Sequence, residues 1–142
     1  MIKLVPYFSK SNPLHVNVYP AIRKMENECI SILIDLFNGD KDTCGVFTSG
    51  GTESILMACY AYKKLGYDKK GITKPEIILP VTAHAAFDKA ADYFSITLHK
   101  IPINFDTYQL DIDFLVNSIN NNTIAIVGSA PSFSHGIMDP IE

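Results

Sequence analysis

The sequence lacks several features, and each absence narrows the choice of protein class. Its three cysteines, Cys29, Cys44 and Cys59, form no C-x-x-C pair, and an odd number without a framework suggests a reducing compartment. No apolar stretch approaches the roughly 20 residues that cross a bilayer, and the N-terminus is not typical of a signal peptide. The four histidines show no ligand spacing and no long basic run exists, so we expect neither a metal site nor nucleic-acid binding.

The composition that is present is that of a globular domain. The chain has 142 residues, of which 47% are hydrophobic and 19% charged, with a net charge of −3. This length suits one compact domain with a substantial core, and the hydrophobic fraction excludes a disordered segment. We expect an irregular segment over residues 1–19, where prolines and a Ser-Asn-Pro turn occur, and a folded domain over residues 20–142.

The pattern of apolar residues and turn signals alternates between strands and helices along the chain. It predicts four helices. The first runs from Pro20 to an end at Asn38-Gly39, the second covers 52–65 with a stop at Gly66, the third covers 84–94, and the fourth covers 111–119 with Asp111 as its cap. Strands are predicted at 44–48, 76–79, 96–103 and 123–129. This order favours an α/β fold with a mainly parallel sheet flanked by helices.

A glycine turn, Thr48-Ser49-Gly50-Gly51-Thr52-Glu53, joins the first expected strand to a helix. The two glycines permit close approach of a ligand, and the amides and dipole at the start of the helix suit a phosphate dianion. It matches neither a Walker loop nor a dinucleotide-binding fingerprint. A plain strand–helix turn with Thr52 as cap explains the same residues equally well.

Two further side chains are expected at the edge of the sheet where parallel strands end. His84 opens a helix just after a strand, and Ser129 ends the last strand before a loop with Ser132, Ser134 and His135. An imidazole there could stack on a flat cofactor or transfer protons, although on its own a locally bonded histidine is the commoner case. The convergence of three strand ends favours one shared site.

Six blocks resemble, in order, the sphingosine-1-phosphate lyases, a branch of the group II pyridoxal-phosphate-dependent decarboxylase family. The blocks are N-P-L-H at 12–15, Y-P-A-I-R-K-M-E at 19–26, L-F-N-G at 36–39, C-G-V-F-T-S-G-G-T-E-S-I-L-M-A at 44–58, A-H-A-A-F-D-K-A-A at 83–91 and P-S-F-S-H-G-I-M-D-P at 131–140. The resemblance covers nearly the whole chain after about residue 12, and it implies part of the large domain of the aspartate-aminotransferase fold.

The resemblance also implies a cofactor, a reaction and partners. The cofactor would be pyridoxal 5'-phosphate, and the reaction would cleave a phosphorylated long-chain amino alcohol to a fatty aldehyde and phosphoethanolamine. The complete enzyme would be a homodimer. The localisation stays open: the resemblance implies a cytosol-facing protein, associated with the endoplasmic reticulum if it is a eukaryotic relative, although no membrane segment is expected in this chain.

Site residues follow from the resemblance position by position. The turn of Ser49, Gly50, Gly51 and Thr52 would hold the cofactor phosphate. His84 would stack over the pyridine ring as the catalytic residue, and Ser129 would lie near the ring. The substrate would be approached by Asn12, His15 and Tyr19.

Two departures from the family pattern stand out. Where relatives usually have Pro-Gln-Phe-Pro-His-Gly, this chain has Pro131-Ser132-Phe133-Ser134-His135-Gly136. The Asp that pairs with the pyridine nitrogen and the Lys that forms the Schiff base lie further downstream in the family. We therefore expect a fragment that has no lyase activity alone. An inactive remnant or phosphate-binding module, a piece of a related amino-acid decarboxylase, and a flavodoxin-type phosphate-ester-binding domain are the alternatives.

Overall fold

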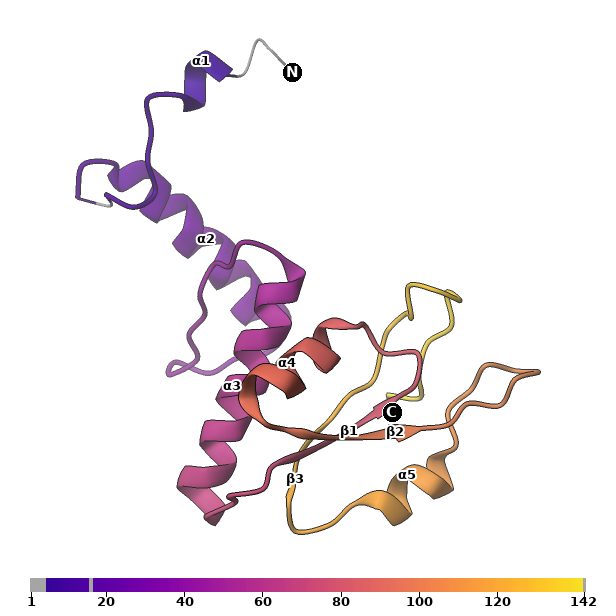
Figure 1. Ribbon diagram of the computed structural model, residues 1–142. Coiled ribbons are helices and arrows are strands. Elements are labelled where there is room, and N and C mark those ends of the chain that lie inside the picture. Colours follow the sequence, from indigo (N-terminus) through magenta and orange to yellow (C-terminus); the bar gives the residue numbers. More distant parts are fainter. Residues whose placement is uncertain (1–4, 16, 142) are drawn as a thin grey trace. The chain divides into compact units, whose positions relative to one another are not determined.

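The computed structural model describes residues 5–15 and 17–141, which form two compact units (Figure 1). The first unit ends at Thr48 and the second begins at Ser49. This division falls further along the chain than the expected boundary at residue 19, and the segment expected to be irregular contains one short helix, α1 (Val5–Phe8).

The first unit is built around the helix α2 (Pro20–Leu36), which starts at the predicted proline. It ends two residues before Asn38, and Asn38 rather than the glycine that follows it takes the left-handed conformation, at φ 55°. Gly39 instead lies where a Cβ atom would come within 2.8 Å of the Ile34 side chain. No residue of this helix is buried, and its apolar side chains Met25, Leu33 and Leu36 are exposed.

The strand predicted at residues 44–48 is wrong. This segment has no regular secondary structure and pairs with no strand in the described part of the chain, and Val46 is 75% exposed. A strand needs a neighbour to accept and donate its backbone hydrogen bonds, which an alternating apolar sequence does not reveal.

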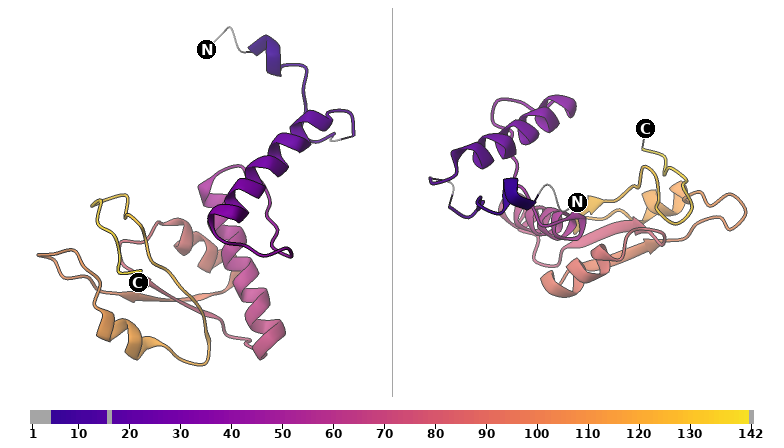
Figure 2. Two further views of the ribbon diagram at one scale, coloured as in Figure 1. Left: turned by 180° about the vertical axis from the view of Figure 1, so that it is seen from behind. Right: turned by 90° about the horizontal axis from the view of Figure 1, so that it is seen from above.

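The second unit confirms the predicted α/β fold with a parallel sheet flanked by helices (Figures 1 and 2). Its three strands lie in the order β2-β1-β3, and both pairings with the central strand are parallel. The elements follow one another as α3 (Gly51–Lys70), β1 (Glu76–Pro80), α4 (Ala86–Phe94), β2 (Thr97–Ile101), α5 (Ile112–Ser118) and β3 (Thr123–Ile126).

The central strand separates two hydrophobic clusters, one on each face of the sheet. Ile77 and Leu79 point to the face covered by α3 and α4, where they pack with Cys59, Ala90 and Ile96. Ile78 points the other way, to the face covered by α5, where it packs with Ile101, Leu110 and Leu115. Successive side chains of a strand alternate between faces, so β1 contributes to both clusters and is buried almost completely.

Gly66 does not end α3, as its sequence position had suggested. It lies inside the helix and is buried, and an added Cβ atom would come within 2.7 Å of Ile124 Cγ2 on β3. The helix continues to Lys70 and is closed by Gly71, which has the left-handed φ of 66°. Gly66 is therefore a close-packing residue between helix and sheet.

Replacing Gly66 by alanine should lower the free energy of unfolding by about 1–2 kcal/mol, because the added methyl group overpacks a contact against a branched side chain. Helix propensity alone predicts the opposite sign, a gain of about 1 kcal/mol. Urea denaturation monitored by circular dichroism measures the difference. The control is Ala61→Gly on the exposed side of the same helix, which should lose about 1 kcal/mol. A stabilised G66A variant would contradict the packing role.

Glu76 joins three elements at the edge of the sheet where the strands begin. Its Oε2 atom accepts hydrogen bonds from Asn120 Nδ2 at 2.7 Å and from His99 Nε2 at 2.8 Å. These residues lie on the loop before β3 and on β2. The hydrogen bond from Asn120, assisted by that from His99, lowers the pKa of Glu76 below its ordinary value.

The lowered pKa of Glu76 predicts a loss of stability in acid. The folded state binds this proton less readily than the unfolded chain, so the ionised carboxylate stabilises the fold above the ordinary glutamate pKa of about 4.3, and this contribution disappears as the pH falls through the folded value. Glu76→Gln should therefore flatten the decline of stability between about pH 5 and pH 3. Denaturation midpoints measured across this range test it, with Glu28→Gln at an exposed position of α2 as control. Equal acid sensitivity of E76Q and wild type would sink the assignment.

Candidate functional site

The turn before α3 leaves open space beside its backbone. Gly50 is the N-cap residue and Gly51 the first residue of the helix, and a Cβ atom added at either would meet nothing within 4 Å. The amides of a first helical turn have no acceptor within the helix, and they carry the positive end of its dipole. This geometry fits an anion. Thr52 forms no side-chain cap, so the plain-cap interpretation of Thr52 finds no support.

Glu53 forms a hydrogen bond to this turn, a contact that the sequence motif alone did not indicate. Its Oε2 atom accepts a hydrogen bond of 2.6 Å from the backbone N–H of Ser49. Hydrogen bonds from the Ser49 side chain and backbone lower the pKa of the Glu53 carboxyl, which stays ionised at neutral pH. A capping box would place the acid three residues after the serine, whereas Glu53 follows Ser49 by four, so the sequence carried no capping signal for this contact.

His84 lies in the loop between β1 and α4. Its Nδ1 atom accepts a hydrogen bond of 3.0 Å from the backbone N–H of Ala86, and its carbonyl accepts from Phe87. The imidazole thus bonds locally to the start of α4, the simpler of the two interpretations. The same contact fixes the ring, and in the neutral form it leaves the proton on Nε2.

Ser129 is held at the base of the loop after β3. Its N–H donates to Asp139 Oδ2 at 2.7 Å, and its carbonyl accepts from the Asp139 N–H at 2.9 Å. Asp139 is buried, with 6% of its surface exposed. This two-way contact closes the loop and fixes Ser129 near the end of the strand.

The strand directions place three of these features at one edge of the second unit. The three strands are parallel, so their ends at Pro80, Ile101 and Ile126 share an edge, and the loops with His84 and Ser129 leave from it. Helix α3 runs the opposite way, since its last turns lead into β1 and Gly66 packs on the start of β3. Its 20 residues span about 30 Å, enough for the glycine turn to reach that edge.

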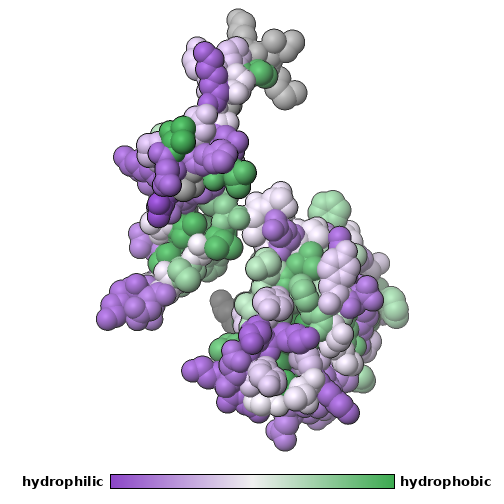
Figure 3. Space-filling view, turned by 60° about the vertical axis from the view of Figure 1, so that its left-hand side comes forward, coloured by the Kyte–Doolittle hydropathy of each residue, from purple (hydrophilic) through white to green (hydrophobic). Residues whose placement is uncertain are grey.

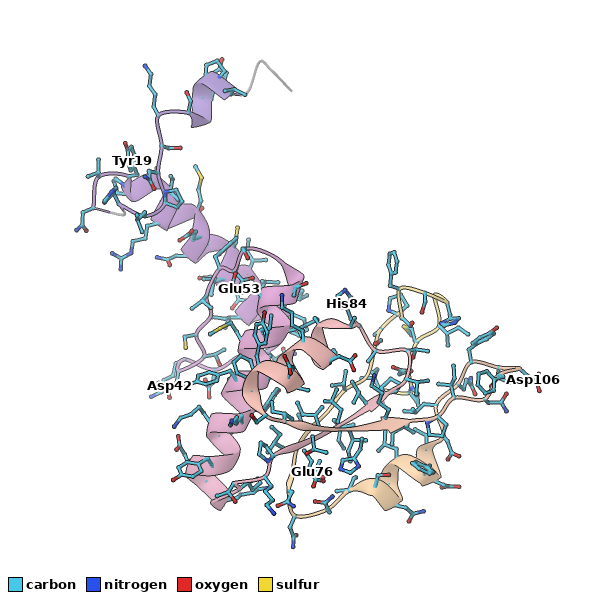
Figure 4. All side chains as sticks on the ribbon, in the orientation of Figure 1. Tyr19, Asp42, Glu53, Glu76, His84 and Asp106 are labelled. Carbon is cyan, nitrogen blue, oxygen red and sulfur yellow. The ribbon has the colours of Figure 1, made fainter. Side chains whose placement is uncertain are left out.

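Figure 4 shows the same arrangement, with Glu53 and His84 near the beginnings of α3 and α4. These two helices pack against each other, through contacts that include the Tyr60 and Phe94 rings at 5.4 Å. The imidazole and the glycine turn therefore lie at the same edge of the sheet, not at opposite edges.

The remaining predicted residues belong to the first unit. Asn12 Oδ1 accepts from the Leu14 N–H at 2.9 Å, and the His15 carbonyl accepts from Val18 and Tyr19. Asn12 and His15 are exposed on successive tight turns before α2, and Tyr19 is its N-cap residue. Their role at the substrate stays a prediction.

The described residues contain neither a metal-binding cluster nor a membrane-spanning helix. In residues 5–15 and 17–141, no group of three His, Cys, Asp or Glu side chains is arranged to hold a metal ion. No helix in those ranges has both the length and the apolar character of a membrane span.

Comparison with solved structures identifies the class of fold first. Glutamate decarboxylase from Lactobacillus brevis superposes with a TM-score of 0.79 at 24% identity, over 97% of this chain and 33% of its own. The described architecture is thus part of a decarboxylase-type α/β fold. No family model matches the sequence.

Comparison with curated sequences identifies the particular relatives. The sphingosine-1-phosphate lyase of Saccharomyces cerevisiae is 53% identical over 133 residues, and that of Mus musculus is 48% identical over 134. The structure of the Burkholderia pseudomallei sphingosine-1-phosphate lyase matches with a TM-score of 0.87 and 36% identity over 98% of this chain and 34% of that one. The chain is therefore homologous to the sphingosine-1-phosphate lyases, which confirms the resemblance of the ordered motifs.

The extent of the match is partial on the side of the relatives. The aligned region covers 93% of this chain but 23% of the yeast protein, and 94% of this chain but 23% of the mouse protein. The chain spans about a quarter of the length of these curated relatives.

The contact between Ser49 and Glu53 generates a prediction about the order of the turn. Glu53→Ala should speed hydrogen exchange of the Ser49 amide, because its acceptor is lost, whereas Glu53→Gln should retain part of the protection through its amide oxygen. Exchange of the assigned amide by NMR measures both. Glu28→Ala, on α2, is the matched control. Unchanged protection of Ser49 in E53A would rule out this hydrogen bond.

Proposed function

We propose that the protein carrying this chain is a pyridoxal-phosphate-dependent carbon–carbon lyase. Its substrates would be phosphorylated long-chain amino alcohols such as sphingosine 1-phosphate, and its products a fatty aldehyde and phosphoethanolamine. The observation that carries this proposal is the 53% identity to the yeast sphingosine-1-phosphate lyase over 133 residues, which include nearly all of the chain. The decarboxylase structures share the fold at lower identity and favour no separate activity.

The turn of Ser49, Gly50, Gly51 and Thr52 is proposed to hold the cofactor phosphate. The open space around both glycines admits an anion close to the backbone, and the first-turn amides of α3 would donate to its oxygens. The Thr52 hydroxyl adds a donor beside them. Glu53 would keep the turn ordered through Ser49.

His84 and Ser129 are proposed to contact the cofactor ring from the same sheet edge. The imidazole plane of His84 is fixed by the Ala86 amide, which suits stacking on a flat heteroaromatic ring. Ser129 is fixed by Asp139, so its side chain would meet the ring without reorganising the loop. When bound, the pyridoxal ring supplies an electron sink that weakens the bond next to the substrate's amine-bearing carbon.

Substrate contacts are proposed for Asn12, His15 and Tyr19, which supply amide, imidazole and phenol groups from the first unit. In the complete protein these residues would serve the site of a partner subunit in a homodimer. None of the lysines present, including Lys63, Lys64, Lys69, Lys70 and Lys89, lies in a family lysine motif, so the 142-residue polypeptide alone is expected to release no aldehyde.

The sharpest test separates folding from cofactor binding at the glycine turn. In the full-length product of the gene, Gly51→Ala should leave the unfolding free energy unchanged or raise it by up to about 1 kcal/mol, because alanine favours the helix and finds open space. The same methyl group would occupy the proposed phosphate position and should weaken pyridoxal-phosphate binding at least tenfold. Titration of the visible absorption band of the bound cofactor measures the affinity.

The controls for this test are matched in residue type. Thr52→Ala should weaken cofactor binding in the same direction, by the loss of one hydroxyl donor. Thr73→Ala, in the exposed connector between α3 and β1, should have no effect. Full cofactor affinity in G51A would refute the phosphate assignment, and a full-length protein that forms no cofactor band and releases no aldehyde would refute the proposed function.

A further inference from the structure

A histidine outside the proposed cofactor site is held in place from two directions. Ile103 and Leu110 pair as an isolated antiparallel bridge after β2 and close a hairpin. Within it, Tyr108 has the left-handed φ of 57°, which is uncommon for a tyrosine. The Tyr108 ring stacks on His135, with the ring centroids 4.5 Å apart and the planes at 29°. An unfavourable backbone conformation is thus retained where it places an aromatic ring against an imidazole.

A chain of two hydroxyl groups fixes the edge of the same imidazole. Ser134 Oγ lies 2.9 Å from His135 Nδ1, and Ser132 Oγ lies 3.3 Å from Ser134 Oγ. Ser132 is only 5% exposed. Its backbone is fixed as well, since its N–H donates to Ile137 and its carbonyl accepts from Gly136. The hydroxyl chain therefore begins at a buried, anchored residue and ends on the histidine ring.

The burial of Ser132 decides the direction of the first of these hydrogen bonds. The Ser132 hydroxyl has no other acceptor among the described residues, and a buried donor left without a partner is costly, so Ser132 donates to Ser134. Ser134 is exposed, and it extends the chain when it donates its own proton to His135 Nδ1. In this arrangement the neutral ring carries its proton on Nε2.

Nε2 of His135 is therefore an oriented donor at the carboxyl edge of the sheet. None of the described residues hydrogen-bonds it, and His135 is exposed. Its loop leaves β3 at the same edge as the loop with His84, and Figures 1 and 2 show the hairpin and this loop side by side at the end of the sheet. An oriented N–H donor of this kind suits an anionic oxygen.

We propose that His135 is a substrate-binding residue whose Nε2–H donates to a phosphate oxygen of the phosphorylated amino alcohol, with Ser132, Ser134 and Tyr108 as its positioning residues. This role rests on the proposed function, which brings such a substrate to this edge. Ser132 and Ser134 are the two positions where the sequence departs from the Gln and Pro of the family pattern. A proline at 134 offers no hydroxyl, so this positioning belongs to the present chain.

The first test is kinetic and uses the full-length product of the gene. His135→Phe keeps a ring on Tyr108 but removes the donor, and it should raise KM for the long-chain base phosphate roughly tenfold or more, as expected for one lost hydrogen bond to a charged group, with kcat changed less than about twofold. His135→Gln should recover part of the loss. Ser134→Ala and Ser134→Pro should raise KM by a smaller factor. Ser118→Ala, which removes a hydroxyl that donates to the Phe114 carbonyl on α5, is the matched control.

The second test needs no turnover. Nitrogen-15 NMR of the histidine side chains, assigned with H135F, should show the Nε2-protonated form of His135 at rest and a shift of its Nε2 signal on adding phosphoethanolamine, but none on adding pyridoxal phosphate. A signal that moves with inorganic phosphate alone and not with phosphoethanolamine would overturn the substrate role. So would an Nδ1-protonated resting ring or an unchanged KM in H135F. A wild-type protein without cofactor band or aldehyde release would refute the proposed function instead, and the NMR titration would still decide the role of His135.

Discussion

The burial of β1 on both faces is the constraint on which the second unit depends. Ile77 and Leu79 anchor the layer of α3 and α4, while Ile78 anchors α5 on the opposite side. Because the neighbouring strands pair with β1 in parallel, their ends and the loops that follow must share one edge. The candidate site is therefore a consequence of hydrophobic packing, which brings together loops that are up to some tens of residues apart in sequence.

The two edges of the sheet in the second unit differ in the polar groups that they carry. At the edge where the strands begin, Glu76 collects hydrogen bonds from His99 and Asn120 and ties neighbouring elements together. At the opposite edge, the start of α3 presents amides that fit an anion, and Glu53 lies beside them. The carboxylate at the first edge accepts its hydrogen bonds from neighbouring elements, whereas the turn at the second edge has open space beside Gly50 and Gly51. Figure 3 shows that hydrophobic residues also reach the surface of both units.

Local patterns predicted much of this architecture. The starts of α2 and α5 followed from Pro20 and from Asp111, whose side chain accepts from the Phe114 N–H as expected. Features that depend on distant partners could not be predicted in this way. Gly66 was mistaken for a stop because its contact with Ile124 lies 58 positions away (124 − 66). The site showed the same limit: the glycine turn, His84 and Ser129 were found from their strand ends, but the contact of Tyr108 with His135 required the folded hairpin.

The cysteines give the two units different chemistry toward thiol reagents. Cys29 and Cys44 are exposed in the first unit, while Cys59 is 2% exposed in the cluster between α3 and the sheet. Burial raises the pKa of the Cys59 thiol, so the reactive thiolate is scarce even where a reagent could reach it. Alkylation of Cys59 thus requires α3 to separate from the strands, and the modification rate at this one sulfur atom reports how often the helix carrying the glycine turn detaches.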